Sequence, residues 1–329
     1  DTEARKTGVT IARATPFAPT IKVKPNKQPT DMRGPYMAIS SVIEIEKVMA
    51  RSVAELPEEC LSHVVSFTCP RDACRSSAVC GVFHGAADSD LTWEKFLPSD
   101  YREIISRSVC PPEFVSKKEL FEKLSAAPLL IDGGNKEYLK TLENGNKLFA
   151  MTFCVDKYTN KRCYMLSARE LSITWSSNPL CWCWKPTQLS RFPESIELIS
   201  VCRLEILGKF DTRMLSPNTT YGAYLVFQLT NRAFGLSASP FEVSVEIGDC
   251  KKRGRFYLKQ DECKGQEEPD VAPEALSPRG DGWSEVELGE FYVGGAHREV
   301  KLEFKEVKSE HLKGGLLVDG VELRPKRFF

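Results

Sequence analysis

The sequence predicts an α+β multidomain protein in which a short helical half precedes an all-β domain of the sandwich or jelly-roll type. Up to about residue 162 apolar side chains recur at helical spacing, and from residue 163 onward they alternate with polar ones. With 329 residues, 42% of them hydrophobic, the chain is long enough for two domains with their own cores. We expect four segments, at 1–53, 54–98, 99–162 and 163–329.

The first segment, residues 1–53, is predicted to be a disordered N-terminal extension with one candidate helix at 40–53. Residues 1–37 carry seven basic and three acidic residues. An organelle transit peptide, a disordered tail and a mispredicted upstream exon all fit this composition. The candidate helix rests on apolar residues at helical spacing, which are Val42, Ile45, Val48 and Met49.

Residues 54–98 are predicted to form a module of short helices. Leu56-Pro57 marks the start, because proline restricts the residue before it and is well tolerated in the first turn of a helix. Helices this short cannot bury all of their apolar surface alone, so the module is expected to bind a partner. The apolar stripe of the first helix consists of Cys60, Leu61, Val64 and Val65.

Residues 99–162 are predicted to be a helical connector. Ser116-Lys-Lys-Glu119 fits a capping box, in which the side chains at the start of a helix satisfy its free backbone N–H groups. An apolar face follows at Leu120, Phe121 and Leu124. The connector should therefore contain at least one helix that starts at this box.

Residues 163–329 are predicted to form the β-domain. Several runs alternate apolar and polar side chains, as half-buried strands do. By contrast, residues 250–280 are polar and charged and are expected to form a long exposed loop. The alternating apolar positions are Ala223, Leu225, Phe227 and Leu229; Phe241, Val243, Val245 and Ile247; and Val300, Leu302 and Phe304.

Composition argues against several function classes. Forty-five basic residues balance forty-five acidic ones, so no overall field draws the chain to nucleic acid. The twelve cysteines include no Cys-x-x-Cys pair and there are four histidines, so we expect no metal and no cofactor. No apolar run approaches the roughly 20 residues of a membrane span. No nucleophile, base and orienting group recur together, so the chain is expected not to be an enzyme.

Motifs along most of the chain resemble one plant subfamily, the F-box proteins with a phloem protein 2-like domain. Leu56 to Cys80 resembles an F-box, with Leu-Pro-Glu at its start and Ala78-Val79-Cys80 at the close of its second helix. The resemblance covers residues 54–327. Its further motifs are Trp93-Glu-Lys-Phe-Leu-Pro98, Ser116-Lys-Lys-Glu-Leu120, Cys163 to Trp175, Asp281-Gly-Trp283 and Gly315 to Pro325.

The resemblance implies that the helical module docks onto the Skp adaptor of a cullin-based ubiquitin ligase. The chain would then be a substrate receptor that works in the cytoplasm and nucleus, where its thiols stay reduced. One departure is that many F-boxes carry a Trp just after the Val-Cys pair, where this chain has Phe83. The residues expected to contact the adaptor are Leu56, Pro57, Leu61, Val64, Val65 and Phe67.

The resemblance also implies a sugar site, because the β-domain is similar to Nictaba, a plant lectin that binds GlcNAc oligomers and N-glycan cores. Trp175 and Trp182 match the two tryptophans of that lectin's site, and Glu299 and Glu306 match its two acidic residues. An aromatic platform suits the apolar face of a sugar ring, and carboxylates accept hydrogen bonds from its hydroxyl groups. The client would be a glycoprotein with GlcNAc-containing chains.

The residues themselves leave alternatives open. Trp175 and Trp182 are seven positions apart, so one unbroken strand would aim them at opposite faces, unless the turn signal Ser176-Ser-Asn-Pro179 resets the direction. Glu299 and Glu306 differ in parity in the same way. The tryptophans are otherwise core residues, as we expect of Trp184 and Trp283. The β-domain then binds a protein surface and no sugar, or the chain is a free lectin with a vestigial F-box.

Overall fold

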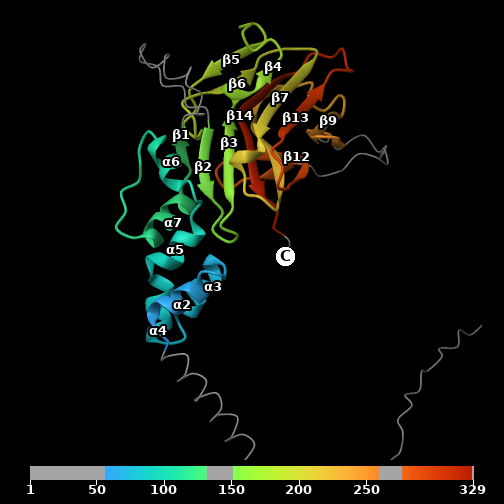
Figure 1. Ribbon diagram of the computed structural model, residues 1–329. Helices are drawn as coiled ribbons and strands as arrows, with labels where there is room; N and C mark the ends of the chain where they lie inside the picture. Colours follow the sequence, from blue (N-terminus) through green and yellow to red (C-terminus); the bar gives the residue numbers. More distant parts are fainter. Residues whose placement is uncertain (1–55, 132–150, 259–275, 328–329) are drawn as a thin grey trace, which may run out of the picture. The chain divides into compact units, whose positions relative to one another are not determined.

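Figure 1 shows the computed structural model of the chain, which describes residues 56–131, 151–258 and 276–327. The expected extension at 1–53 and its candidate helix lie outside these residues. As the sequence predicts, short helices come first and strands follow. The helices of the described part are α2 (Glu58–Val65), α3 (Pro70–Ser76), α4 (Gly81–Asp88), α5 (Asp90–Phe96), α6 (Tyr101–Ser106) and α7 (Lys117–Ala126).

Side-chain caps set the starts of several helices. The Cys69 thiol accepts a hydrogen bond from the Asp72 N–H at the start of α3, and the Ser89 hydroxyl accepts one from Leu91 at α5. At α7 the Ser116 hydroxyl accepts the Glu119 N–H, while the Glu119 carboxylate accepts the Val115 N–H at 2.8 Å. Both side chains thus satisfy backbone donors around the start of α7, and the helix predicted from the capping box is confirmed.

Trp93 fixes the interior of the helical half. Its indole N–H donates to the Ala87 carbonyl at 2.6 Å, and its ring lies 5.4 Å from Phe96 and 5.2 Å from Phe121. Phe121 belongs to α7, so helices of the module and of the connector share one aromatic core. The Lys117 N–H adds a bond from the start of α7 to the Asp90 carboxylate at 2.7 Å.

The connector is helical only in its first part, and the prediction of helix over 99–162 is wrong for its end. Strands β1 (Leu129–Ile131) and β2 (Met151–Val155) lie within it, and they pair with each other and, through β2, with β3 (Arg162–Ser167). Four of the five β2 residues are buried, so the strand shows no alternation of apolar and polar residues. A strand covered on both faces cannot be recognised from a period of two.

The β-domain consists, within the described residues, of a nine-stranded and a five-stranded antiparallel sheet. The central order of the large sheet is β1-β2-β3-β14-β8-β12-β11, with β6 pairing β14 and β5 pairing β6. The order of the small sheet is β10-β9-β13-β7-β4. The remaining bounds are β4 (Ser172–Ile173), β5 (Trp182–Lys185), β6 (Ser195–Leu198), β7 (Leu204–Asp211), β8 (Thr219–Phe234), β9 (Phe241–Ile247), β10 (Cys250–Phe256), β11 (Leu276–Pro278), β12 (Ser284–Val293), β13 (Glu299–Glu306) and β14 (Gly314–Pro325).

The three alternating runs of the sequence are confirmed as strands β8, β9 and β13. The exposed loop expected at 250–280 is wrong at its start, because Cys250–Phe256 forms β10 and pairs with β9. Gly248, at φ +55°, turns the chain between these two strands. β10 is an edge strand exposed over all but its last residue, so it has no buried face for an apolar pattern to mark.

The two sheets pack face to face and enclose the main core. Tyr164 of β3 lies 5.5 Å from Phe210 of β7, which joins the layers through their rings. Phe241 and Phe304 stack at 5.0 Å within the small sheet. Where β12 bulges, Gly289 lies against Val245 of the opposite layer at φ +146°, so a side chain at this position would be strained. The predicted sandwich is confirmed.

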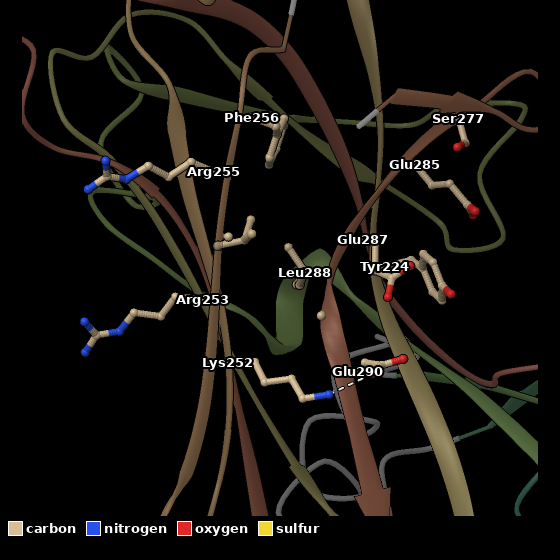
Figure 2. Close-up of a pocket in the computed structure, with 13 residues that line it drawn as sticks. Tyr224, Lys252, Arg253, Arg255, Phe256, Ser277, Glu285, Glu287, Leu288 and Glu290 are labelled. Atoms are coloured by element: carbon tan, nitrogen blue, oxygen red, sulfur yellow. Dashed lines mark hydrogen bonds and ion pairs between the residues drawn. The ribbon is translucent and has the colours of Figure 1, made fainter. Parts of the chain in front are cut away.

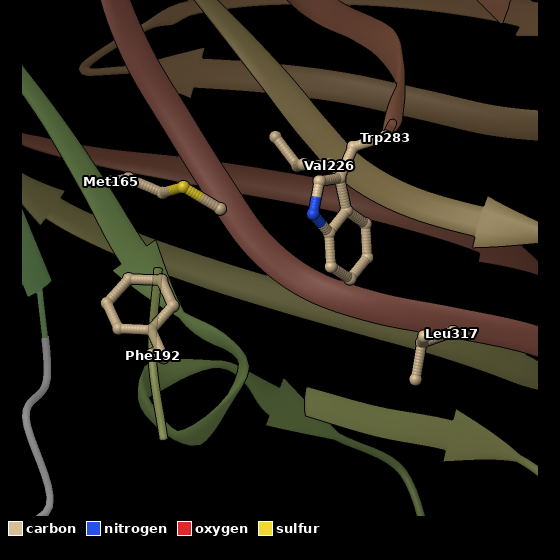
Figure 3. Close-up of a cluster of buried hydrophobic side chains, with 5 residues drawn as sticks. All are labelled: Met165, Phe192, Val226, Trp283 and Leu317. Carbon is tan, nitrogen blue, oxygen red and sulfur yellow. The ribbon is translucent and has the colours of Figure 1, made fainter. Parts of the chain in front are cut away.

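A second core covers the other face of the large sheet. Figure 3 shows its five side chains, in which the Trp283 indole lies beside Val226 of β8. The Trp283 N–H donates to the Leu189 carbonyl at 2.9 Å, and this bond holds the loop between residues 185 and 195 over the sheet. Trp283 is thus a core residue, as expected. The whole cluster consists of Met165, Phe192, Val226, Trp283 and Leu317.

Buried charges on the same face are paired by arginines. Glu322 of β14 accepts hydrogen bonds from Arg279 at 2.6 Å and from Arg191 at 2.9 Å. Arg324 adds a third ion pair to Glu322 at 3.1 Å and also bonds Glu285. Burial raises the pKa of the Glu322 carboxyl, but the three guanidinium groups outweigh this effect and lower the pKa from 4.5 to about 2.

This network predicts an acid-sensitive contribution to stability. Because folding lowers the Glu322 pKa, the stabilisation is complete above pH 4.5 and is lost as the pH falls toward 2. Replacing Glu322 with Gln should lower the free energy of unfolding at pH 7 by on the order of 3 kcal/mol and flatten its pH dependence in that window. Urea unfolding across this pH range measures both effects. Glu299→Gln, at an exposed site, is the control, and an unchanged acid dependence in Glu322→Gln would contradict the assignment.

Candidate functional site

The helical module presents part of its predicted docking face to solvent. Val64 is 57% and Phe67 is 76% exposed; Val64 lies in the last turn of α2, and Phe67 follows the helix by two residues. Leu56 and Pro57, at the start of the same helix, are also exposed. The ring of Phe67 meets His63 edge-on at 4.8 Å, which orients it along the helix surface. We call Leu56, Pro57, Val64 and Phe67 the α2 surface.

Two of the residues expected to contact an adaptor, Leu61 and Val65, lie on the buried side of α2. Leu61 is 2% and Val65 is 3% exposed, so neither side chain is available to a partner in this conformation. They are four residues apart on one side of α2, where they fill the interior of the module with residues such as Ala86 and Ala87. The expected stripe is therefore split: Leu61 and Val65 support the fold, and Val64 faces outward.

Trp175 stands out on the β-domain surface. It follows β4, is 48% exposed and has a left-handed backbone at φ +60°. A non-glycine residue there costs about 1–2 kcal/mol, and such strain often marks functional positions. The turn is held by the Asn178 N–H, which donates to the Trp175 carbonyl at 2.9 Å. The expected turn between Trp175 and Trp182 is confirmed.

The interpretation of Trp182 as a sugar platform needs correction. Its side chain is 2% exposed, and its indole N–H donates to the Thr174 carbonyl at 3.0 Å. Trp182 thus supports the Trp175 turn from below. Trp184, assigned to the core from sequence, is partly exposed, and the guanidinium of Arg169 lies 3.5 Å from its ring centroid. One face of that ring is already occupied.

The two predicted carboxylates lie at opposite ends of β13. Glu299 pairs with Asp211 and Glu306 with Leu204 in the β13–β7 ladder, so they are roughly 23 Å apart at 3.3 Å per residue. Glu299 is exposed beside Lys209. Glu306 is buried: it lies 2.7 Å from Lys313 and accepts the Ser309 N–H at 2.9 Å. Glu306 therefore anchors the turn after β13 and does not face solvent.

The structure brings Trp175, Trp182 and the Glu306 end of β13 to one end of the sandwich and leaves Glu299 at the other. The link is β7: the Thr174 N–H donates to the Glu205 carbonyl, and Leu204 is the partner of Glu306. The four residues thus do not form one pocket. The exposed member at this end is Trp175.

Sequence reasoning missed Glu205, which lies beside the Trp175 turn. Its carboxylate accepts a hydrogen bond from the Thr174 hydroxyl at 3.3 Å and is partly exposed. Exposed Leu180 and Ile199 lie nearby, joined by the Ile199 N–H bond to the Cys181 carbonyl. We call Trp175, Leu180, Ile199 and Glu205 the Trp175 surface. The sequence does contain a pattern that could have indicated Glu205: it lies between Leu204 and Ile206, which are buried, so the alternation of side chains along β7 places Glu205 on the outer face.

Neither a membrane-spanning helix nor a metal-binding cluster occurs in the described part of the chain. None of its helices is long and apolar enough to cross a bilayer. No group of three or more His, Cys, Asp or Glu side chains in those same ranges is placed to hold a metal ion.

Comparison with known proteins identifies both halves of the chain. The F-box-like family matches residues 53–99, and the phloem protein 2 family matches residues 161–325. The chain belongs to the F-box proteins that carry a phloem protein 2 domain. It is 42% identical over 294 residues to F-box protein PP2-B15 of Arabidopsis thaliana, with 82% of this chain and 96% of the relative covered.

Other relatives and a solved structure complete the comparison. F-box protein VBF of Arabidopsis thaliana is 41% identical over 293 residues, with 82% of this chain and 99% of the relative covered. A family 35 carbohydrate binding module from Clostridium thermocellum covers 49% of this chain and 96% of its own at 10% identity and a TM-score of 0.27. A score this low carries no argument about the ligand.

The strained backbone predicts an unusual order of stability at position 175. Trp175→Gly should be more stable than Trp175→Ala by about 1 kcal/mol, because glycine adopts positive φ without steric cost. Urea unfolding of both variants measures the difference. In the same series Trp182→Ala should lose about 3–5 kcal/mol as a buried aromatic. Equal stability of the two position-175 variants would show that the turn is not strained.

Proposed function

We propose that this chain is the substrate receptor of a Skp-cullin-F-box ubiquitin ligase. The observation that carries the proposal is the α2 surface, where Val64 and Phe67 stay exposed although the interior beneath them is filled by Leu61 and Val65. A short helix with apolar side chains left in water is suited to packing against helices of another protein. The Skp adaptor would cover this surface, and a cullin complex would join through the adaptor.

The chain would contribute position and no catalytic group. Ubiquitin transfer would be the task of other subunits, while the β-domain holds the client. The shared aromatic core of Trp93 and Phe121 supports this role, because it ties the docking module to the helix that precedes the β-domain. Such a receptor would act in the cytoplasm and nucleus, where its exposed thiols, such as Cys60 and Cys80, remain reduced.

For the client, the proposal is a glycoprotein with GlcNAc-containing chains or N-glycan cores, bound at the Trp175 surface. The half-exposed indole would stack on the apolar face of a sugar ring, and the Glu205 carboxylate would accept hydrogen bonds from its hydroxyl groups. The backbone strain at Trp175 supports this assignment, because a glycine would hold the same turn at less cost.

A second candidate function is recognition of a protein surface without sugar. It is favoured by the burial of Trp182 and Glu306, which leaves one aromatic platform where the family match implied two. Exposed Leu180 and Ile199 beside Trp175 would suit an apolar protein contact. Both versions keep the adaptor role of the helical module.

The adaptor role predicts a specific loss of binding. Val64→Asp combined with Phe67→Asp should weaken binding of a purified Skp adaptor at least about a hundredfold, since truncation of a central apolar anchor alone costs about 2 kcal/mol or more. Isothermal titration calorimetry measures the affinity, and circular dichroism checks the fold. Val115→Asp, at a valine that is exposed outside the module, is the matched control. Undiminished binding by the double variant would sink the proposal.

Sugar binding predicts a loss confined to Trp175. On a glycan array the full chain should bind chitin oligomers or N-glycan cores, and Trp175→Ala should reduce this binding at least about tenfold through loss of the stacking contact. Tyr292→Ala removes another exposed aromatic ring and should bind normally. If the array stays silent while adaptor binding is intact, the client is recognised as a protein.

A further inference from the structure

The outer edge of β10 has the features of a peptide-binding strand. Within the described ranges β10 pairs only with β9, so it forms one edge of the five-stranded sheet. Residues from Cys250 to Arg255 are all exposed. β10 is a full seven-residue strand, joined to β9 by the two-residue turn Gly248-Asp249. A long exposed edge of this kind offers unpaired backbone groups to another chain.

The hairpin geometry shows which backbone groups are free. Ile247 and Cys250 flank the two-residue turn and close the hairpin, so they form a hydrogen-bonded pair. Bonding alternates along antiparallel strands, and therefore Lys252, Gly254 and Phe256 direct their backbone groups toward β9. Lys251, Arg253 and Arg255 direct theirs to the open edge.

The same three residues give the edge a positive charge. Their side chains lie on the outer face of the sheet, in register with Glu246, Ser244 and Glu242 of β9. Lys251 lies 3.4 Å from Glu246 and 3.7 Å from Glu303, and Arg255 lies 3.4 Å from Glu242, so these ion pairs are long. Arg253 has no ion pair among the described residues. The positive charge of Arg253 is thus unpaired, and a partner could also compete for the long ion pairs of Lys251 and Arg255.

A cleft of about 450 Å³ lies on the other side of the strand, between β10 and β12. Phe256, Val243 and Leu288 form the apolar part of its lining, and Gly254 leaves the middle of β10 without a side chain. The β12 side carries Glu285, Glu287 and Glu290, whose carboxylates are paired with Arg324, Lys326 and Lys252. Lys252 reaches across to Glu290 at 2.8 Å, while Arg253 and Arg255 point away from the cleft (Figure 2). The edge therefore has a cationic outer face and a partly apolar inner face.

We propose that β10 binds an acidic, extended peptide of a partner protein, which adds to the small sheet as a further strand. Successive side chains of a strand point to opposite faces. Every second residue of the peptide would be acidic and lie beside Lys251, Arg253 and Arg255. The residues between them would be apolar and enter the cleft, with space for a large side chain opposite Gly254.

This site is separate from the two surfaces of the proposed function. In the small sheet β10 and β4 are opposite edges, four strand spacings or roughly 19 Å apart, and Trp175 follows β4. A client that bound both the Trp175 surface and the β10 edge would be held more tightly than by either site alone, because the second binding event would be intramolecular. Basic edge strands also occur simply to prevent aggregation. That simpler role requires no preference for an alternating peptide.

The test uses the full chain and a fluorescently labelled heptapeptide in which glutamate alternates with leucine, phenylalanine and valine. Fluorescence anisotropy should show at least tenfold tighter binding than for a peptide of the same composition with its glutamates in one block. Equal binding of the two peptides would overturn the proposal. Equal competition by heparin or by single-stranded DNA would also overturn it, because the edge would then attract any polyanion.

Two substitutions at one position separate charge from backbone. Arg253→Ala should weaken binding about threefold by removing one cation. Arg253→Pro should weaken it at least a further tenfold, because proline also removes the N–H at the open edge without touching a bond to β9. Equal affinities of these two variants would exclude strand addition.

A further pair of variants covers the case in which proline disturbs the strand. Arg253→Glu keeps the N–H and should weaken binding at least tenfold, whereas Lys209→Glu, on the same face of β7, should leave it unchanged. Equal effects would refute a specific site. Adaptor and glycan binding should persist in all four variants, so failure of this site is distinguishable from failure of the proposed function.

Discussion

The antiparallel pairing of β8 with β14 is the constraint on which the β-domain depends. The ladder runs from Gly314↔Phe234 to Pro325↔Tyr221 through the middle of the large sheet. β14 and the Tyr221–Phe227 part of β8 are covered on both faces, by the small sheet on one side and by the Trp283 cluster and the Glu322 network on the other. β14 also pairs with β6, whose partner β5 holds Trp182 under the Trp175 turn. The strained turn is therefore supported from the centre of the fold.

The burial of β14 on both faces also explains why its Glu322 carboxylate forms ion pairs. Glu322 alternates with apolar residues along β14, and such a carboxylate would be costly if it faced a dry layer alone. Its guanidinium partners come from three different segments, Arg191, Arg279 and Arg324. The network thus ties distant parts of the chain to one strand. Lys313 and Glu306 are buried at the end of β13 and form an ion pair for the same reason.

The functional surfaces lie where the fold leaves apolar groups uncovered. In the helical half, Leu61 and Val65 fill the interior, and the apolar side chains of Val64 and Phe67 remain exposed. On the β-domain, Trp182 occupies the interior, and Trp175 is displaced to the surface by a left-handed turn. At the opposite edge of the small sheet, β10 combines open backbone groups with Arg253, which has no ion pair among the described residues. The first two of these surfaces lie directly over buried neighbours, Leu61 and Val65 in one case and Trp182 in the other.

The sequence by itself determined the order of the elements and the class of the fold. Periodicity and caps are local, so the helix after Ser116 and the strands around Val245 and Leu302 were predictable, and the motifs predicted the family. Only the tertiary structure decided which side of each element is covered. It buried Leu61, Trp182 and Glu306, separated Glu299 from the other site residues, and made a strand of Cys250–Phe256. Burial depends on which element packs opposite, and that partner lies far along the chain, beyond the reach of any local pattern.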